Sequence, residues 1–336
     1  MDDKTSTGVV TISGYDLSWM DMFRGLIIVA AIAVPLVLPD FQTALVIEIF
    51  LLAMFAMSLD LLMGYTGYVS FGHAAFFATS AYLTGLTLMH VTTSALVAIS
   101  VGILSVAIIA VPIGYFSLKR TGIYFAMLTL AFSQVLHVLV VNDFMGLTGG
   151  SDGLTGLPRG NFAIPGIFDF VPTQMGYYYL LLTTFVVAYL LMRRIVNSPF
   201  GAVMVAIREN ENRAKYAGYD VDRFKLIAFI ASAMFGGLAG ALYMPFYQVL
   251  SPDIFFWDFS GEAIVIVLVG GMGTLVGPVL GAFLFVGLRE IVSPFLADWT
   301  MVLGVVFILF ILFLPNGMIS IRDFVIHHLD SEDDES

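Results

Sequence analysis

Apolar residues in this chain come in long runs separated by short polar segments. Several runs approach or exceed roughly 20 residues, the length that an α-helix needs to cross a bilayer. The pattern therefore predicts about ten spans, and a re-entrant pair in place of the eighth and ninth would change that count by about two. The predicted spans are residues 25–38, 43–63, 73–88, 95–118, 122–141, 176–192, 226–249, 260–270, 275–292 and 301–314.

Composition supports an all-α, polytopic membrane protein. The chain is 59% hydrophobic and 12% charged, with a mean hydropathy of +0.96, whereas a soluble domain carries roughly 25% charged residues. No cleavable signal peptide is evident in the polar first 24 residues. Without cysteine there are no disulfides or thiolate sites, and the redox compartment is not indicated. We expect an N-terminal extension (1–24), a membrane domain (25–320) and an acidic tail (321–336).

Half of the positive charge lies in one loop, residues 193–225, which holds seven of the 14 Lys and Arg. Basic loops between spans mark the cytoplasmic side of a membrane protein. Lys119 and Arg120 form a second basic site two spans earlier, and the loop 142–174 between them has one Arg and three Asp. This pattern predicts that both basic sites and both termini are cytoplasmic, in a prokaryotic cell membrane.

The basic loop itself predicts a short charged helix from about residue 203 to 217. Pro199 suits a helix start, and Gly218 suits a helix end. Such a helix is either a docking surface for a cytosolic partner or a solvated connector whose charges only fix topology. Charge alone leaves both interpretations open.

The formal net charge of −11 has two sources in the sequence: an acidic C-terminal tail and acidic outside loops. The tail is most simply disordered. Adaptation to a salty cytoplasm is a further hypothesis, which a salt titration of stability would test.

Residues 64–77 interrupt the apolar pattern with glycine and hydroxyl side chains. Unwound backbone at membrane depth is tolerated where protein or a watery cavity covers it, and transporters use such breaks at substrate sites. The alternative is a tight cytoplasmic turn followed by close helix contact, with His73 in a polar helix–helix contact. The candidate pathway residues are Gly64, Tyr65, Thr66, Gly67, Ser70, Gly72 and His73, together with Glu48.

Two sets of glycines at four-residue spacing predict smooth helix faces for close packing. They are Gly236 and Gly240, and Gly273, Gly277 and Gly281. A phosphate-cradling loop is excluded, because no Gly-Lys-Ser/Thr sequence follows these glycines.

Four carboxylates lie at apparent membrane depth: Glu48, Asp60, Glu262 and Glu290, the last beside Arg289. A carboxylate at a helix centre costs on the order of 2.5–3.5 kcal/mol, so it usually faces a cavity or a partner. We place Glu48 near mid-span and favour an interfacial position for Asp60 and Glu262. Proton or sodium coupling through these acids is the alternative.

The sequence offers no enzyme constellation, metal site or cofactor site. The five histidines are scattered without metal-ligand spacing, and no serine has recognisable catalytic partners.

Five motifs together resemble the permease of a branched-chain amino-acid ABC importer, of the LivM type. The resemblance spans about residues 25–320 and implies a type II ABC importer-like fold. The motifs are GYTGYVSFGHAAFF (64–77), GIYFAMLTLA (122–131), LTGGSDGL (147–154), LVGGMGT through Gly277-Pro278 (268–278) and FLPNG (313–317).

The resemblance implies that the basic loop is the coupling loop, which docks into an ATPase subunit. The implied coupling residues are Arg208, Glu209, Asn210, Ala214 and Gly218. Because this chain has no ATP site of its own, the implied partners are two separate ATPase subunits, a sister permease and an extracytoplasmic binding protein. Transport would proceed by alternating access.

Three other functions remain open at this stage. A permease for urea or short amides differs only in substrate. An ion-coupled secondary transporter would use Glu48, Asp60 and Glu262, and would take up substrate without an ATPase. A structural or receptor-like role has little support, because it does not explain the charged helix predicted in the basic loop.

Overall fold

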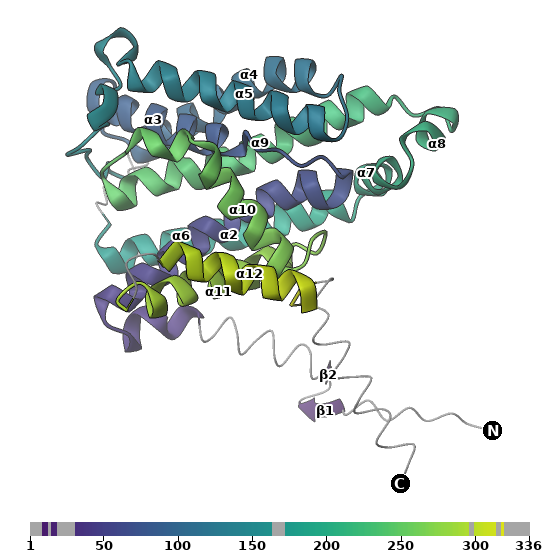
Figure 1. Cartoon of the computed structure of the whole chain (residues 1–336). Coiled ribbons are helices and arrows are strands. Elements are labelled where there is room, and N and C mark those ends of the chain that lie inside the picture. Colours follow the sequence, from purple (N-terminus) through teal and green to yellow (C-terminus); the bar gives the residue numbers. More distant parts are fainter. Residues whose placement is uncertain are drawn as a thin grey trace.

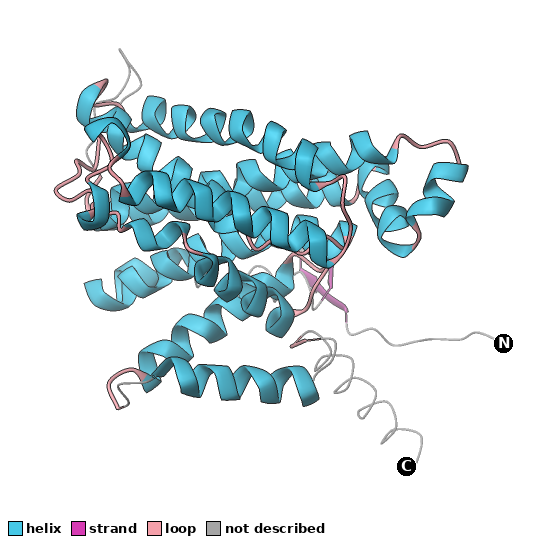
Figure 2. Cartoon of the chain, turned by 45° about the horizontal axis from the view of Figure 1, so that its top comes forward, coloured by secondary structure: helices cyan, strands magenta, loops and turns pink. Residues whose placement is uncertain are grey.

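The computed structural model describes residues 9–12, 15–18, 31–162, 172–295, 299–313 and 317–318. The acidic tail, most of the N-terminal extension and part of the first predicted span lie outside these residues. Two short strands, β1 (Val9–Ile12) and β2 (Tyr15–Ser18), pair as an antiparallel hairpin. Otherwise the described chain is almost entirely helical (Figure 2).

The helices follow the predicted spans closely. Residues 31–37 are helical at the end of the first span. The later helices are α2 (Asp40–Thr66), α3 (His73–His90), α4 (Ala95–Ser117), α5 (Ile123–Val141), α6 (Gln174–Val196), α7 (Pro199–Glu209), α8 (Glu211–Tyr216), α9 (Val221–Tyr247), α10 (Trp257–Gly270), α11 (Val276–Val292) and α12 (Trp299–Phe313), with single 3-10 turns at Phe144–Gly146, Gly150–Asp152 and Pro252–Phe255.

Among the described residues, five helices are long and apolar enough to cross a membrane: α2, α4, α5, α6 and α9. The helices α10, α11 and α12 coincide with predicted spans but have only 14, 17 and 15 residues. The helical membrane fold is therefore confirmed, and the count of about ten spans stays a prediction.

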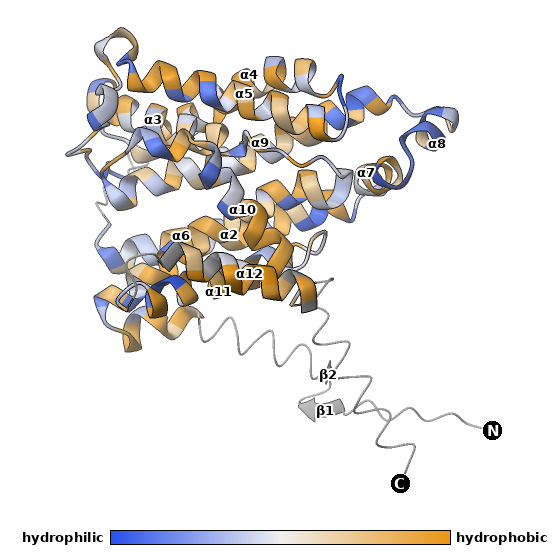
Figure 3. Ribbon diagram, in the orientation of Figure 1, coloured by the Kyte–Doolittle hydropathy of each residue, from blue (hydrophilic) through white to orange (hydrophobic). Residues whose placement is uncertain are grey.

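Helices α2 and α9 form the centre of the bundle. Helix α9 packs on α2, α3 and α4, while α2 also packs on α6, α10 and α11. In Figure 1, α3, α4, α5 and α9 lie on one side, and α2, α6, α11 and α12 lie on the other. Helices α7 and α8 project from one end, and Figure 3 shows polar residues concentrated there. We call this the α7–α8 end of the bundle.

The glycines of α9 allow the close packing that their spacing predicts. A Cβ at Gly240 would lie 1.9 Å from the carbonyl oxygen of Phe77 on α3. A Cβ at Gly236 would lie 3.1 Å from both His73 Nε2 and Ser58 Oγ. Neither position has room for a larger side chain without moving a neighbouring helix.

The second glycine set is only partly as predicted. Gly277 and Gly281 lie on α11, where added Cβ atoms would come within 2.3 Å of Gly271 O and 2.1 Å of Ile266 O. Gly273 does not lie on this helix face, because α11 begins at Val276. It lies instead in the α10–α11 turn with φ +79°, a left-handed conformation that glycine adopts without strain.

Candidate functional site

The basic loop folds as a helical hairpin rather than the single helix that the sequence predicted. The break falls at Asn210, whose backbone is extended (φ −160°, ψ 100°). Its side-chain oxygen accepts a hydrogen bond from Arg213 N at 2.9 Å, which caps α8. Ser198 caps α7 before Pro199, and Gly218 follows α8 with φ +90°. The polar cap at Asn210 thus divides one expected helix into α7 and α8.

A small hydrophobic core holds the hairpin together. It contains Val203 and Ile207 of α7, Ala214 of α8 and Val221 of α9, with Phe224 packed against it. Ala214 is only 4% exposed, so it faces inward rather than toward a partner. The outward face carries Tyr216, which is 90% exposed, and the exposed Gly218.

Arg208 connects the hairpin to the membrane helices. Its Nη1 donates a hydrogen bond to the carbonyl oxygen of Gly64, near the end of α2. A Cβ at Gly67 would lie 3.3 Å from Arg208 Cγ, and one at Gly273 would lie 3.4 Å from Arg208 Nη1. The Arg208 side chain therefore lies against two glycines of positive φ: its aliphatic stem faces Gly67 after α2, and its guanidinium faces Gly273 in the α10–α11 turn.

Asp60 fixes the same turn from the other side. Its carboxylate is fully buried and accepts hydrogen bonds from Gly273 N at 2.7 Å and Leu275 N at 3.3 Å. Hydrogen bonds to a charged group are among the stronger ones in proteins. The carboxylate therefore serves as a buried acceptor for the turn, and the interfacial position favoured for Asp60 stays a prediction. We call Asp60, Gly64, Arg208 and Gly273 the polar junction.

A second polar contact joins α8 to the bundle through Lys225 of α9. Its Nζ lies 3.1 Å from Glu211 Oε1, 3.4 Å from Asp222 Oδ1 and 3.2 Å from Tyr68 Oη. The side chain of Lys225 is only 2% exposed. Tyr68 Oη also donates to Glu211 Oε2 at 3.1 Å. Lys225 and Glu211 therefore both contact Tyr68, which lies in the segment after α2. Hydropathy and charge did not predict this network. The feature that could have indicated a buried polar contact is Lys225 itself, a lysine in the first turns of an otherwise apolar helix.

The pKa of Glu211 gives the network a dependence on pH. Partial burial raises this pKa, but hydrogen bonds from Lys215, Lys225 and Tyr68 lower it overall to below its usual 4.5. A depressed carboxylate pKa stabilises the folded state above the unfolded-state value and loses that contribution as pH falls through the folded-state value. We therefore expect amide hydrogen exchange in α8, corrected for its intrinsic rate, to increase once pH falls below about 4.5.

The Glu211→Gln variant tests this cause. It should exchange faster than the parent at pH 7, and the difference should vanish in acid. Glu209→Gln is the matched control, since Glu209 makes no ion pair within the described part of the chain. An equal effect of both variants would contradict the assignment.

Most of the Gly64–His73 segment is buried, although Gly67 is exposed. Residues 67–72 are not helical, and Ser70 is fully buried. His73 begins α3, with its Nε2 2.9 Å from Ser58 Oγ of α2 and its ring stacked on Phe55. A Cβ at Gly72 would lie 2.2 Å from Thr129 O of α5. These positions therefore make close contacts between helices, as one of the two sequence-based interpretations expected. Their role in a substrate pathway stays a prediction.

Glu48 has a partner within the chain. Its Oε2 accepts a hydrogen bond from Arg289 Nη2 of α11 at 2.6 Å. This ion pair joins two helices far apart in sequence, at a position where each side chain is still partly exposed (17% and 26%). Glu262 on α10 lies close enough to interact electrostatically with both. The arginine partner fits the expectation for an intramembrane acid, and the position of Glu48 near mid-span stays a prediction.

Comparison with known proteins decides the family. The family model described as branched-chain amino acid transport system / permease component matches residues 42–314. The chain belongs to this family.

Three curated relatives of this permease show how it compares with named proteins. The chain is 26% identical to the high-affinity branched-chain amino acid transport system permease protein LivM of Escherichia coli K12, over 89% of this chain and 74% of that protein. It is also 26% identical to the probable LivM permease of Methanocaldococcus jannaschii, over 79% and 89% of the two chains. The Salmonella typhimurium LivH permease is 25% identical, over 72% and 81%.

The family membership confirms the resemblance that the motifs indicated. The permease is a multi-pass membrane protein of the branched-chain amino acid ABC transport type, similar to LivM proteins. The naming of relatives as permease components also fits a role other than enzyme. No solved structure matches the chain.

Proposed function

We propose that this permease is one transmembrane subunit of an ATP-driven importer for branched-chain amino acids. The named specificity of the LivM and LivH relatives supports the substrate class. It would pair with a sister permease, since both LivM and LivH proteins are similar to this chain. Two separate ATPase subunits and an extracytoplasmic binding protein complete the proposed assembly.

The observation that carries the proposal is the construction of the α7–α8 hairpin. It projects from the bundle (Figure 1), has its own small core, and is bonded to α2 and α9 by Arg208 and Glu211. A solvated connector would need none of these contacts. A rigid projection that is bonded to the membrane helices can pass a movement of an attached subunit into the bundle.

The contacts of the polar junction support a route for that movement. Arg208 contacts the end of α2 and the α10–α11 turn, and Asp60 of α2 is bonded to the same turn. A displacement of α7 would therefore act on α2, α10 and α11 together. We propose this as the step that couples ATP binding to alternating access, with the α7–α8 end facing the cytoplasm.

The proposed docking face of the hairpin contains different residues from those that the sequence predicted. Ala214 supports the hairpin from within, while Tyr216 and Gly218 face outward. Exposed aromatic side chains are enriched among residues that dominate binding at protein interfaces. We therefore assign the contact to the exposed face of α8, with Arg208 and Asn210 as its support; the coupling role of Glu209 stays a prediction.

Replacement of Tyr216 by Glu should weaken ATPase association about tenfold or more, because it removes an aromatic anchor and adds a charge. The measurement is co-purification of ATPase subunits with the tagged permease. Val91→Glu is the control, since Val91 is 77% exposed in the loop after α3, away from the hairpin. Normal co-purification of ATPase subunits with the Tyr216→Glu variant would contradict the assignment of this face.

The whole proposal is tested by co-expressing the permease with the ATPase and permease genes beside it. Co-purification together with leucine uptake that requires ATP is the expected result. Uptake by the permease alone under a sodium or proton gradient would overturn it. Two of the three acids that an ion-coupled mechanism would use already have partners within the chain, because Glu48 is paired with Arg289 and Asp60 binds backbone amides.

A further inference from the structure

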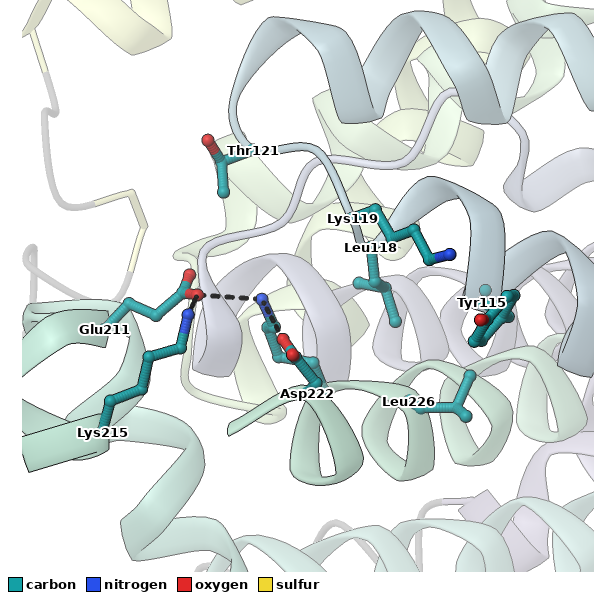
Figure 4. A pocket seen from close by; sticks show the side chains of 10 residues that line it. Tyr115, Leu118, Lys119, Thr121, Glu211, Lys215, Asp222 and Leu226 are labelled. Atoms are coloured by element: carbon teal, nitrogen blue, oxygen red, sulfur yellow. Dashed lines mark hydrogen bonds and ion pairs between the residues drawn. The ribbon is translucent and has the colours of Figure 1, made fainter. Parts of the chain in front are cut away.

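A cavity of about 440 Å³ lies at the α7–α8 end, between the end of α4 and the start of α9. Figure 4 shows that Tyr115, Leu118 and Lys119 border it on one side and Glu211, Lys215 and Asp222 on another. Gly114 and Leu226 complete an apolar wall. The cavity therefore has one apolar side and one charged side.

The charges around this cavity are not balanced. Glu211 pairs with Lys215 and Lys225, and Asp222 pairs with Lys225. Both carboxylates in the lining are therefore already in ion pairs. Lys119 has no carboxylate partner within the described ranges, and its Nζ lies 4.1 Å from the centre of the Tyr115 ring. Arg120, the next residue, is likewise exposed and has no described carboxylate partner.

An exposed apolar stripe on α4 leads to the cavity. Leu104, Ile108, Val111 and Tyr115 are 60%, 73%, 46% and 54% exposed. Their spacing of four, three and four residues places them on one face of the helix. Since α4 is among the helices able to cross a membrane, this face is suited to acyl chains. Lys119 lies one further turn along the same face.

We propose that this cavity binds the headgroup of an anionic phospholipid, with an acyl chain along the α4 stripe. The phosphate would lie beside Lys119 on the cavity wall, with Lys215 across the cavity and Arg120 next to Lys119 just outside the lining. There, positive charge without a described carboxylate partner meets the edge of the apolar face. Basic pockets beside membrane helices bind anionic headgroups on this principle. A soluble anion would use the charges but would leave the apolar wall and the stripe without a partner. A bound headgroup would also contact the α7–α8 hairpin itself, through Lys215 of α8.

The test is lipid retention by the purified permease. The full chain is reconstituted in nanodiscs with equal parts phosphatidylglycerol and phosphatidylcholine, extracted into detergent, and its retained lipid is measured by native mass spectrometry. The parent should retain phosphatidylglycerol in preference to phosphatidylcholine. The double variant Lys119→Gln/Arg120→Gln should lose about 20-fold or more of that preference, since each charge contributes about fivefold.

The matched control is Arg193→Gln/Arg194→Gln. It removes two adjacent exposed cations from the last turn of α6, and these residues do not line the cavity. General attraction to an anionic surface would decrease equally in both double variants, whereas a bound headgroup is lost only in the first. Lys119→Arg keeps the charge and should keep the preference.

Two results would overturn the proposal. One is equal retention of phosphatidylglycerol by the parent and by the Lys119→Gln/Arg120→Gln variant. The other is displacement of phosphatidylglycerol by millimolar inorganic phosphate, which would identify a site for a soluble anion. The readout is lipid binding alone, so it is independent of whether the permease works with an ATPase.

Discussion

Arg208→Ala should lower ATP-driven uptake by about tenfold or more while the ATPase subunits still co-purify. Its guanidinium donates to Gly64 O and lies against Gly273, while its aliphatic stem lies against Gly67. A hydrogen bond to a charged group contributes about 1.5–3 kcal/mol, which corresponds to roughly tenfold to a hundredfold in an equilibrium. The same bond is the direct link from α7 to α2, so its loss should uncouple the hairpin from the bundle.

Two measurements on the purified complex separate coupling from assembly: ATPase subunits bound per permease, and substrate taken up per ATP hydrolysed in proteoliposomes. Arg194→Ala is the control, since Arg194 is an exposed arginine at the end of α6 without a side-chain partner among the described residues. Arg208→Lys should be intermediate, because an ammonium keeps the charge but not the planar fork of donors. Unchanged uptake per ATP in Arg208→Ala would contradict the coupling role.

Gly240→Ala should destabilise the membrane domain by about 3 kcal/mol or more. The added Cβ would lie 1.9 Å from Phe77 O, and that oxygen belongs to the backbone of α3. A flexible side chain could rotate away, but a helix backbone can only move as a whole. Helix α9 packs on α2, α3 and α4, so separation from α3 would disturb the centre of the bundle.

The thermal midpoint of the detergent-solubilised protein, followed by size-exclusion chromatography, measures this effect. Gly287→Ala is the matched control, since Gly287 is also helical and an added Cβ there meets nothing within 4 Å. It should be neutral or slightly stabilising, because alanine favours helix by about 1 kcal/mol over glycine. A similar midpoint for both variants would show that the α3–α9 contact does not limit stability.

The sequence by itself determined the helical membrane fold and the approximate positions of its helices. This follows from physics, because the bilayer requires a fixed length of apolar helix and each span therefore leaves a visible run. The positions of α4, α5 and α6 agree with expectation to within a few residues. The motif resemblance also found the family, which a match over residues 42–314 confirms.

Hydropathy could not predict which positions meet across the bundle. The contacts of Arg208 with Gly64, of Asp60 with Gly273, and of Lys225 with Glu211 and Tyr68 mostly join residues far apart in the chain. A periodic pattern places a residue on a helix face but does not give the rotation of that helix against its neighbours.

The predicted coupling residues illustrate what the sequence could and could not determine. Charge and spacing located the loop, yet a single polar cap at Asn210 broke the expected helix, and the resulting fold turned Ala214 inward and Tyr216 outward. Side-chain orientation depends on packing between elements, so only the tertiary structure decided which residues of the loop hold it to the bundle and which face outward.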